Sequence, residues 1–323
     1  MMRFIAFGEA LVDMLSSRLG DSRAQETFTP YAGGAPANVA VACARLGVPS
    51  AFVGMLGQDR FGDFLLEELK AHGVDVRHVV RTLEAKTALA FVSRDATGER
   101  RFDFYRPPSA DLLYRPAHLP EGLFDAQSLL HLCSNTLTEA DITATTFAVA
   151  ERALGAGALL SVDANLRPNL WPGHRVDVAR VTQLLDKAQL LKLAREELEL
   201  LRGDMPEERW LGERLAAGAR LVVITDGGGP VMALTARGRT RFTPPKVQVV
   251  DTTAAGDAFI GGLISALVEA RLTRDTLAEW VAEPANLKRA VELACRCGAF
   301  AVTRPGAYAS LPRREDLAAL ATG

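Results

Sequence analysis

The segment with the clearest chemistry is VVDTTAAGDAFIGGLISALVEA, at residues 249–270. Asp257 follows the small residues Ala254, Ala255 and Gly256 and stands before a long apolar helical pattern. The first amides of a helix lack partners, and the helix dipole is positive there. With no bulky side chain over them, these amides suit an anion, phosphate above all. A neighbouring carboxylate can accept the proton of a hydroxyl that attacks phosphorus. We therefore predict phosphoryl transfer; a capped helix start without chemistry is the alternative.

A second segment, YAGGAPANVAVACARLGV at residues 31–48, has residue types that suit a polyhydroxy ligand. Gly33 and Gly34 let the backbone approach a ligand closely. Asn38 lies on the first turns of the predicted helix and can both donate and accept hydrogen bonds. With Asp13, just beyond the first predicted strand, it could hold sugar hydroxyls. A purely local polar role for Asn38 is the alternative.

The helix after Asp257 has apolar residues on two adjacent stripes, which predicts burial on more than one side. Gly261 and Gly262 cost about 1 kcal/mol each relative to alanine inside a helix. We expect another helix or backbone to pack closely against them.

Short apolar runs alternate with amphipathic helical patterns along most of the chain. This alternation predicts βαβ units and a mostly parallel sheet with helices on both faces. Polar or glycine-rich loops such as DANLR and DGGG follow these runs, so they should converge at the carboxyl edge of the sheet. The expected strands are 4–8, 128–132, 158–162, 189–193 and 220–225, with a further strand at 246–250.

Residues 87–106 break this rhythm, because two β-type runs flank the turn-like RDATGER. They predict an antiparallel hairpin that stands off the main sheet, with 25–32 as a companion strand. An ordinary edge hairpin on the main sheet is the alternative. An isolated, apolar-faced hairpin can pair with a second copy, so we expect a homodimer.

Composition favours a small-molecule partner. The 323 residues are 48% hydrophobic, and 37 basic against 39 acidic residues leave a net charge of −2. Nothing here predicts a nucleic-acid partner. Glu9 and Asp13 interrupt the first apolar run, so we expect neither a signal peptide nor a membrane span. The four cysteines lack CxxC spacing, which favours free buried thiols and a cytoplasmic location over structural zinc.

Both glycine-containing segments resemble signatures of a known family. DTTAAGDAFIGG and AGGAPANVAVACARLG are similar to the C-terminal and N-terminal signatures of the ribokinase-like (PfkB) carbohydrate kinases. GMLGQDRFGDFL, DANLRPNLWP and VTRPGAYASLP resemble the fructokinase branch. The resemblance implies one kinase domain over 1–323, an α/β three-layer αβα sandwich with a small β-sheet lid from about 10–32 and 86–107. It also implies transfer of the γ-phosphoryl of Mg-ATP to a sugar hydroxyl, fructose O6 above all.

The resemblance also implies roles for individual residues. Asp257 would be the catalytic base, and the amides of residues 254–257 would hold the transferring phosphoryl. The sugar-binding set would be Asp13, Gly33, Gly34, Asn38, Arg106 and Asn165, with Arg167 near the phosphate charge. The nucleotide set would be Lys192, Thr225, Gly227, Gly229, Gly256 and Cys295. Glu197 would order Mg²⁺ through water, and a monovalent cation such as K⁺ could bind around Asp251 and Thr253.

The chain departs from the family pattern at three positions. Ala254 replaces a glycine, Ala194 stands where the magnesium element usually has Asn or Ser, and Cys295 replaces an Asn near the adenine. None of these changes removes the predicted base.

Other functions remain to be weighed against a fructose kinase. The chain lacks the glycine fingerprint of a dehydrogenase and the GxxxxGK[ST] motif of a P-loop enzyme. A non-catalytic sugar or nucleotide sensor would be expected to lose Asp257. Within kinases, ribose, a nucleoside or 2-keto-3-deoxygluconate are alternative acceptors, and Arg106 or Arg167 could supply the cation that a sugar acid needs.

Overall fold

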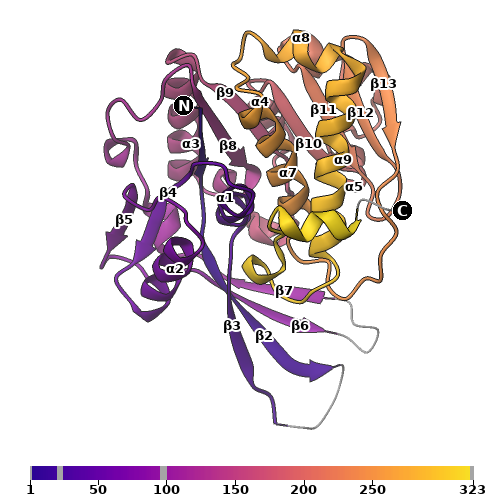
Figure 1. Ribbon diagram of the computed structural model, residues 1–323. Helices are drawn as coiled ribbons and strands as arrows, with labels where there is room; N and C mark the ends of the chain where they lie inside the picture. Colours follow the sequence, from indigo (N-terminus) through magenta and orange to yellow (C-terminus); the bar gives the residue numbers. More distant parts are fainter. Residues whose placement is uncertain (1, 20–24, 95–99, 321–323) are drawn as a thin grey trace.

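A nine-stranded sheet forms the centre of the molecule in the computed structural model, which describes residues 2–19, 25–94 and 100–320 (Figure 1). Its order is β13-β12-β11-β10-β9-β8-β1-β4-β5. Strand β12 pairs antiparallel with both β11 and β13, and the other neighbours pair in parallel. Five of the six predicted strands are confirmed to within one residue. The strands are β1 (Arg3–Phe7), β4 (Ser50–Gly57), β5 (Val79–Thr82), β8 (Ser128–Cys133), β9 (Leu159–Asp163), β10 (Leu190–Ala194), β11 (Leu221–Thr225), β12 (Val231–Thr235) and β13 (Gly238–Phe242).

Helices cover both faces of this sheet, as the alternating pattern predicts. Successive strand residues point to opposite faces, so Phe4 joins one apolar core and Ile5 the other. The first core is covered by α1 (Ala35–Arg45), α2 (Arg60–Ala71), α7 (Ala255–Glu269), α8 (Leu277–Ala282) and α9 (Pro284–Ala301). The second is covered by α3 (Ala140–Gly155), α4 (Val178–Leu185), α5 (Arg195–Arg202) and α6 (Glu207–Ala217).

A separate four-stranded sheet projects from the main body (Figure 1). Its order is β3-β2-β6-β7, formed by β2 (Leu11–Leu19), β3 (Phe28–Gly33), β6 (Leu89–Arg94) and β7 (Arg100–Tyr105). The hairpin therefore stands off the main sheet with β3 as its companion, as predicted, although its turn at 95–99 and the loop at 20–24 lie outside the described residues. The sequence did not reveal β2 as a strand of its own. Asp13 lies within it.

The strand predicted at 246–250 is wrong. Residues 243–249 have no regular secondary structure. The sheet position beside β11 is already taken by the β12–β13 hairpin, which leaves no edge there for another parallel strand. The valines of this segment remain outside the sheet; Val249 and Val250 are 59% and 61% exposed.

The glycines of α7 lie where neighbouring helices approach closely. A Cβ atom at Gly261 would be 2.5 Å from the Cβ of Ala42 on α1, and one at Gly262 would be 2.8 Å from the Sγ of Cys297 on α9. This confirms the predicted close packing and explains why two poor helix formers occupy a buried helix.

Two further expectations can be compared with the structure. All four cysteines are buried free thiols, as predicted. Within the described ranges, no helix combines the length and the apolar character needed to cross a bilayer.

Gly261→Ala should destabilise the fold, although alanine is the better helix former. We expect a loss of about 1–3 kcal/mol, because the added methyl group would overlap Ala42 in a packed core. The matched control is Gly212→Ala on α6, where a Cβ meets no atom within 4 Å. That variant should gain up to about 1 kcal/mol. Urea denaturation measures both, and equal effects at the two positions would contradict this account of the packing.

Candidate active site

A cavity of about 870 Å³ lies at the carboxyl edge of the main sheet, beside the small sheet. Loops that follow β1, β8, β9, β10 and β11 line it, together with the start of α7 and the inner face of β7. The predicted convergence of strand-end loops is therefore present. Of the predicted site residues, the cavity is lined by Asp13, Gly34, Asn38, Arg106, Asn165, Arg167, Lys192, Glu197, Thr225, Gly227, Thr253, Ala254, Ala255, Gly256, Asp257 and Cys295.

The N-terminus of α7 faces this cavity with uncovered amides. Ala254 has left-handed backbone dihedrals (φ 57°, ψ 12°) and no side chain caps the helix. The Ala255 amide donates to the Thr252 carbonyl at 3.3 Å. In the part of the chain that the structure describes, the amides of Gly256 and Asp257 have no hydrogen-bond acceptor. Unpaired amides at a helix start suit an anion.

Asp257 lies on the first turn of α7, with its carboxyl group at the cavity wall. The Asn38 side-chain amide donates to its Oδ2 at 2.7 Å. Burial raises the pKa of Asp257, whereas Asn38 and the charges of Lys192 and Arg167 oppose that rise. Asn38 therefore orients the carboxylate and supports its charged form.

Lys192 supplies a fixed positive charge beneath the same helix start. Its Nζ pairs with Asp163 Oδ2 at 2.9 Å, and both side chains are buried. A Cβ atom at Gly256 would lie 2.9 Å from that Nζ, so a side chain at position 256 would displace the ammonium group. Burial raises the pKa of Asp163 and the Lys192 charge opposes the rise. The pair places a cation beneath the uncovered amides at the start of α7.

Glu197 holds two of the cavity loops together. Its Oε1 accepts from the Leu166 amide and its Oε2 from the Ala194 amide, each at 2.7 Å. The first contact fixes the loop after β9, which carries Asn165 and Arg167, and the second fixes the start of α5. The Asn165 Nδ2 is buried and has no hydrogen-bond partner among the described residues.

The far end of the cavity has a more apolar wall. Thr225 ends β11 and Gly227 follows it. The irregular segment 244–249 lines the same cavity, as do Cys295 and Ala299 of α9. Burial raises the pKa of the Cys295 thiol to about 12, so this side chain is neutral. A flat apolar group such as a base would fit this wall better than a charged one.

Three predicted residues do not line the cavity. Gly33 lies in β3, where a Cβ would be 2.5 Å from Asp13 Oδ2. The Gly229 amide closes a turn onto the Asp226 carbonyl at 2.6 Å. Asp251 accepts from the amides of Thr253 and Gly306, at 2.9 Å each, and so shapes the loop before α7.

Sequence reasoning missed several residues that line the cavity: Glu9, Asn135, Phe102, Phe104 and Val249. Glu9 and Asn135 each follow a main-sheet strand within two residues, so the strand-end rule could have found them. The two phenylalanines belong to β7, and only the position of the small sheet over the cavity reveals them.

The chain matches the pfkB family carbohydrate kinase over residues 1–314. The chain belongs to the PfkB family of carbohydrate kinases. It is 39% identical to fructokinase-1 of Oryza sativa subsp. japonica, over 97% of this chain and 95% of that protein. It is 40% identical to a fructokinase from Xylella fastidiosa solved with bound ATP, with TM-score 0.92 and 98% and 97% of the two chains covered. A fructokinase double mutant from Vibrio cholerae O395, solved with fructose, ADP and a potassium ion, is 32% identical, with TM-score 0.86 and 99% and 98% covered.

These similarities establish the class of enzyme. The protein is a fructokinase-like sugar kinase of the PfkB family, an ATP-dependent phosphotransferase with an alcohol group as acceptor.

Asp257→Asn should stabilise the fold at neutral pH. Burial raises the pKa of Asp257 in the folded state above its ordinary value of 3.8, so stability falls as the pH rises from there through the folded-state pKa. Asparagine has no proton to lose and can still accept from Asn38. We expect a Tm gain of about 1–3 °C at pH 8 that shrinks towards pH 4. Calorimetric scans measure it, with the exposed Asp103→Asn as control; a gain independent of pH would contradict the burial effect.

Proposed function

We propose that this kinase transfers the γ-phosphoryl group of Mg-ATP to O6 of fructose, with Asp257 as the base. The observation that carries the proposal is the Asp257 carboxylate, held by Asn38 at the uncovered start of α7 and beside the Lys192 ammonium. Base, phosphoryl site and cation thus meet at one end of a cavity large enough for a nucleotide and a sugar.

The reaction follows from these positions. The sugar hydroxyl oxygen forms a bond to the γ-phosphorus while the bond to the β–γ bridging oxygen breaks, and that electron pair leaves with ADP. The hydroxyl proton passes to Asp257. The amides of Gly256 and Asp257 receive charge on the phosphoryl oxygens, and Lys192 adds a positive charge beneath them. Catalysis of this kind is mostly positioning and electrostatic stabilisation.

Glu197 fits a water-mediated role toward Mg²⁺. Each of its oxygens accepts one amide and keeps further capacity to accept from water. Among the described residues, no three acidic, histidine or cysteine side chains form a metal-binding group, which suits an ion held mainly by phosphates and water. Mg²⁺ would neutralise negative charge on the phosphates. Loss of activity with EDTA, restored by Mg²⁺, tests this role.

The Asp251–Thr253 loop is the proposed place for K⁺. The Asp251 carboxylate accepts hydrogen bonds from the amides of Thr253 and Gly306, which hold it in place. Carbonyl groups of the loop would be the ligands of K⁺. The Vibrio cholerae structure with a potassium ion supports this proposal. Equal turnover in NaCl and KCl would contradict it.

The small sheet is the proposed cover of the sugar, because Phe102 and Phe104 on β7 line the cavity. Excluding water would limit transfer of the phosphoryl group to water. Its opposite face carries Phe28, Phe91 and Tyr105, packed edge to face, and Tyr105 is 63% exposed.

We propose that this aromatic face pairs with a second copy of the chain. Light scattering should therefore give the mass of a homodimer, and Tyr105→Arg should shift it towards that of one chain, because a charge would be buried at the contact. A wild-type mass of 34.7 kDa, that of a single chain, would contradict the proposal.

An ADP-release assay with a sugar panel tests the function. Fructose should give the highest kcat/KM among fructose, ribose, 2-keto-3-deoxygluconate and adenosine, and little ADP should form without sugar. Asp257→Asn should lower kcat by about 10²–10⁴-fold, since it removes the base, while ATP binding survives. A sensor would release no ADP with any sugar, and wild-type turnover by Asp257→Asn would overturn the assignment of the base.

A further inference from the structure

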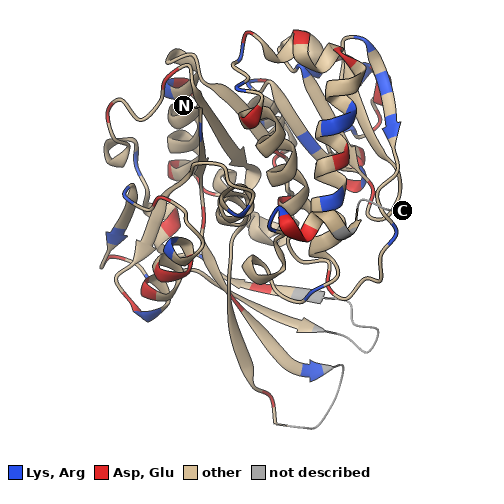
Figure 2. Ribbon diagram, viewed as in Figure 1, with Lys and Arg blue, Asp and Glu red and all other residues tan. Residues whose placement is uncertain are grey.

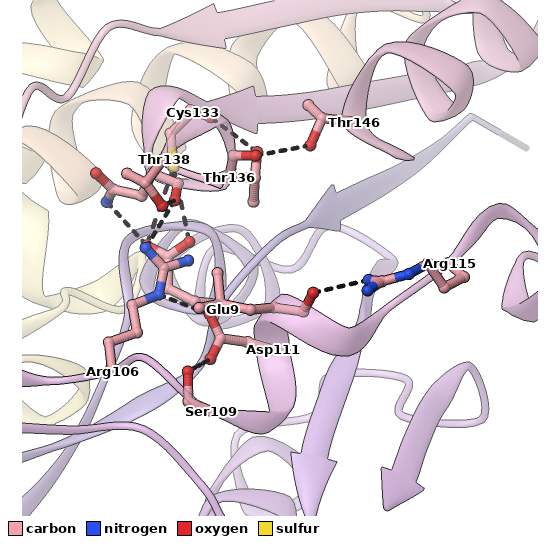
Figure 3. A network of polar contacts seen from close by, with 11 residues as sticks. Glu9, Arg106, Ser109, Asp111, Arg115, Cys133, Thr136, Thr138 and Thr146 are labelled. Carbon is pink, nitrogen blue, oxygen red and sulfur yellow. Dashed lines mark hydrogen bonds and ion pairs between the residues drawn. The ribbon is translucent and has the colours of Figure 1, made fainter. Parts of the chain in front are cut away.

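Arg106 lies directly after β7 and is buried in a network of polar contacts at the cavity wall (Figure 3). Only 2% of the residue is exposed. Its Nε donates to Asp111 Oδ2 at 2.7 Å, and its Nη1 donates to the Asn135 carbonyl at 2.7 Å. Ser109 donates to the other oxygen of Asp111 at 2.6 Å, which fixes that carboxylate. The Arg106 guanidinium is therefore already paired with an acid of the protein, Asp111.

A second buried acid, Glu9, belongs to the same network (Figure 3). It accepts from the Asn135 side-chain amide at 2.9 Å and attracts the Arg106 charge. Burial works against the charge of Arg106, yet Asp111 and Glu9 together raise its pKa. Two carboxyl groups thus surround one guanidinium.

This balance of charge disfavours an acidic ligand. Burial raises the pKa of Glu9 even though Arg106 opposes the rise, so the second carboxylate is already costly to ionise here. A substrate carboxylate at this wall would be a third acid around one cation, in a place with little water. The other cavity arginine, Arg167, acts on Asp257 at the phosphoryl end.

The same wall retains groups that suit a neutral hydroxyl. Arg106 Nη2 and Asn135 Oδ1 are buried and have no hydrogen-bond partner among the described residues. They are one donor and one acceptor on residues that line the cavity. A hydroxyl group donates and accepts at once, whereas a carboxylate can only accept.

We propose that Glu9 and Asp111 are specificity-determining residues, which compensate Arg106 so that the cavity selects a neutral sugar over a sugar acid. The inference rests on the proposed sugar kinase function and names its substrate class. Neither acid takes part in the phosphoryl transfer; each acts through Arg106.

Glu9→Gln tests this selection, because glutamine keeps an acceptor for Asn135 but removes the charge. The measurement is equilibrium binding of fructose and of 2-keto-3-deoxygluconate by calorimetry, without ATP. The wild type should bind fructose more tightly than 2-keto-3-deoxygluconate. In the variant, the ratio of the fructose affinity to the 2-keto-3-deoxygluconate affinity should fall by about tenfold or more. Asp111→Asn should act in the same direction, and Asp103→Asn, an exposed acid on β7, should leave the ratio unchanged.

Thermal melts show whether Glu9→Gln and Asp111→Asn are folded. The affinity ratio of one folded variant is enough to test the proposal. An unchanged ratio in a folded Glu9→Gln or Asp111→Asn protein overturns the proposal, as does a wild type that binds 2-keto-3-deoxygluconate more tightly than fructose. Gluconate and glucitol, used as competitors of fructose binding, form a matched pair that differs only in the carboxylate. The ratio of the glucitol affinity to the gluconate affinity should fall in the variant as the ratio for fructose and 2-keto-3-deoxygluconate does. Because binding is measured without turnover, a failure of phosphoryl transfer to fructose would contradict the proposed function and leave this test intact.

Discussion

The close contact between α1 and α7 fixes the geometry on which the site depends. Asn38 and Asp257 form a hydrogen bond, and four residues further along each helix Ala42 meets Gly261. From the first contact to the second, the residue number rises by about one helical turn on both helices, so α1 and α7 run side by side in the same direction. Only a glycine allows this approach, and the approach brings the first turns within hydrogen-bond distance. The packing of the core thus sets the position of the candidate base.

Two cations of the site, Lys192 and Arg106, lie in buried groups that combine a cation with acids. Lys192 pairs with Asp163 beneath the start of α7, and Arg106 pairs with Asp111 beside Glu9 at the cavity wall. Figure 2 shows charged residues scattered over the ribbon, with the outer strand β13 prominently basic. Inside the cavity, in contrast, Lys192 and Arg106 each pair with a buried acid. Such pairing lowers the cost of burying ions and fixes where each can act.

Much of the fold could be predicted because strand and helix periodicities are local. The start of α7 and the glycines Gly261 and Gly262 were identifiable from residue types alone. The strand at 246–250 failed because alternating valines do not reveal that a hairpin already occupies the sheet edge. Glu9 was missed because next to an apolar run it resembles an interruption of a strand. Its place two residues after β1 marks it as a strand-end residue, and its burial beside Arg106 shows what it does there. Tertiary neighbours decide such cases.

The connection between the two sheets has a mechanical consequence. Only residues 8–10 separate β1 of the main sheet from β2 of the small one, and Gly8 has a φ of 149° that other residues rarely adopt. So short a connection limits how far the small sheet could shift relative to the main sheet. Glu9 lies in this connection, so a change in the tilt of the small sheet would also move the polar network around Arg106.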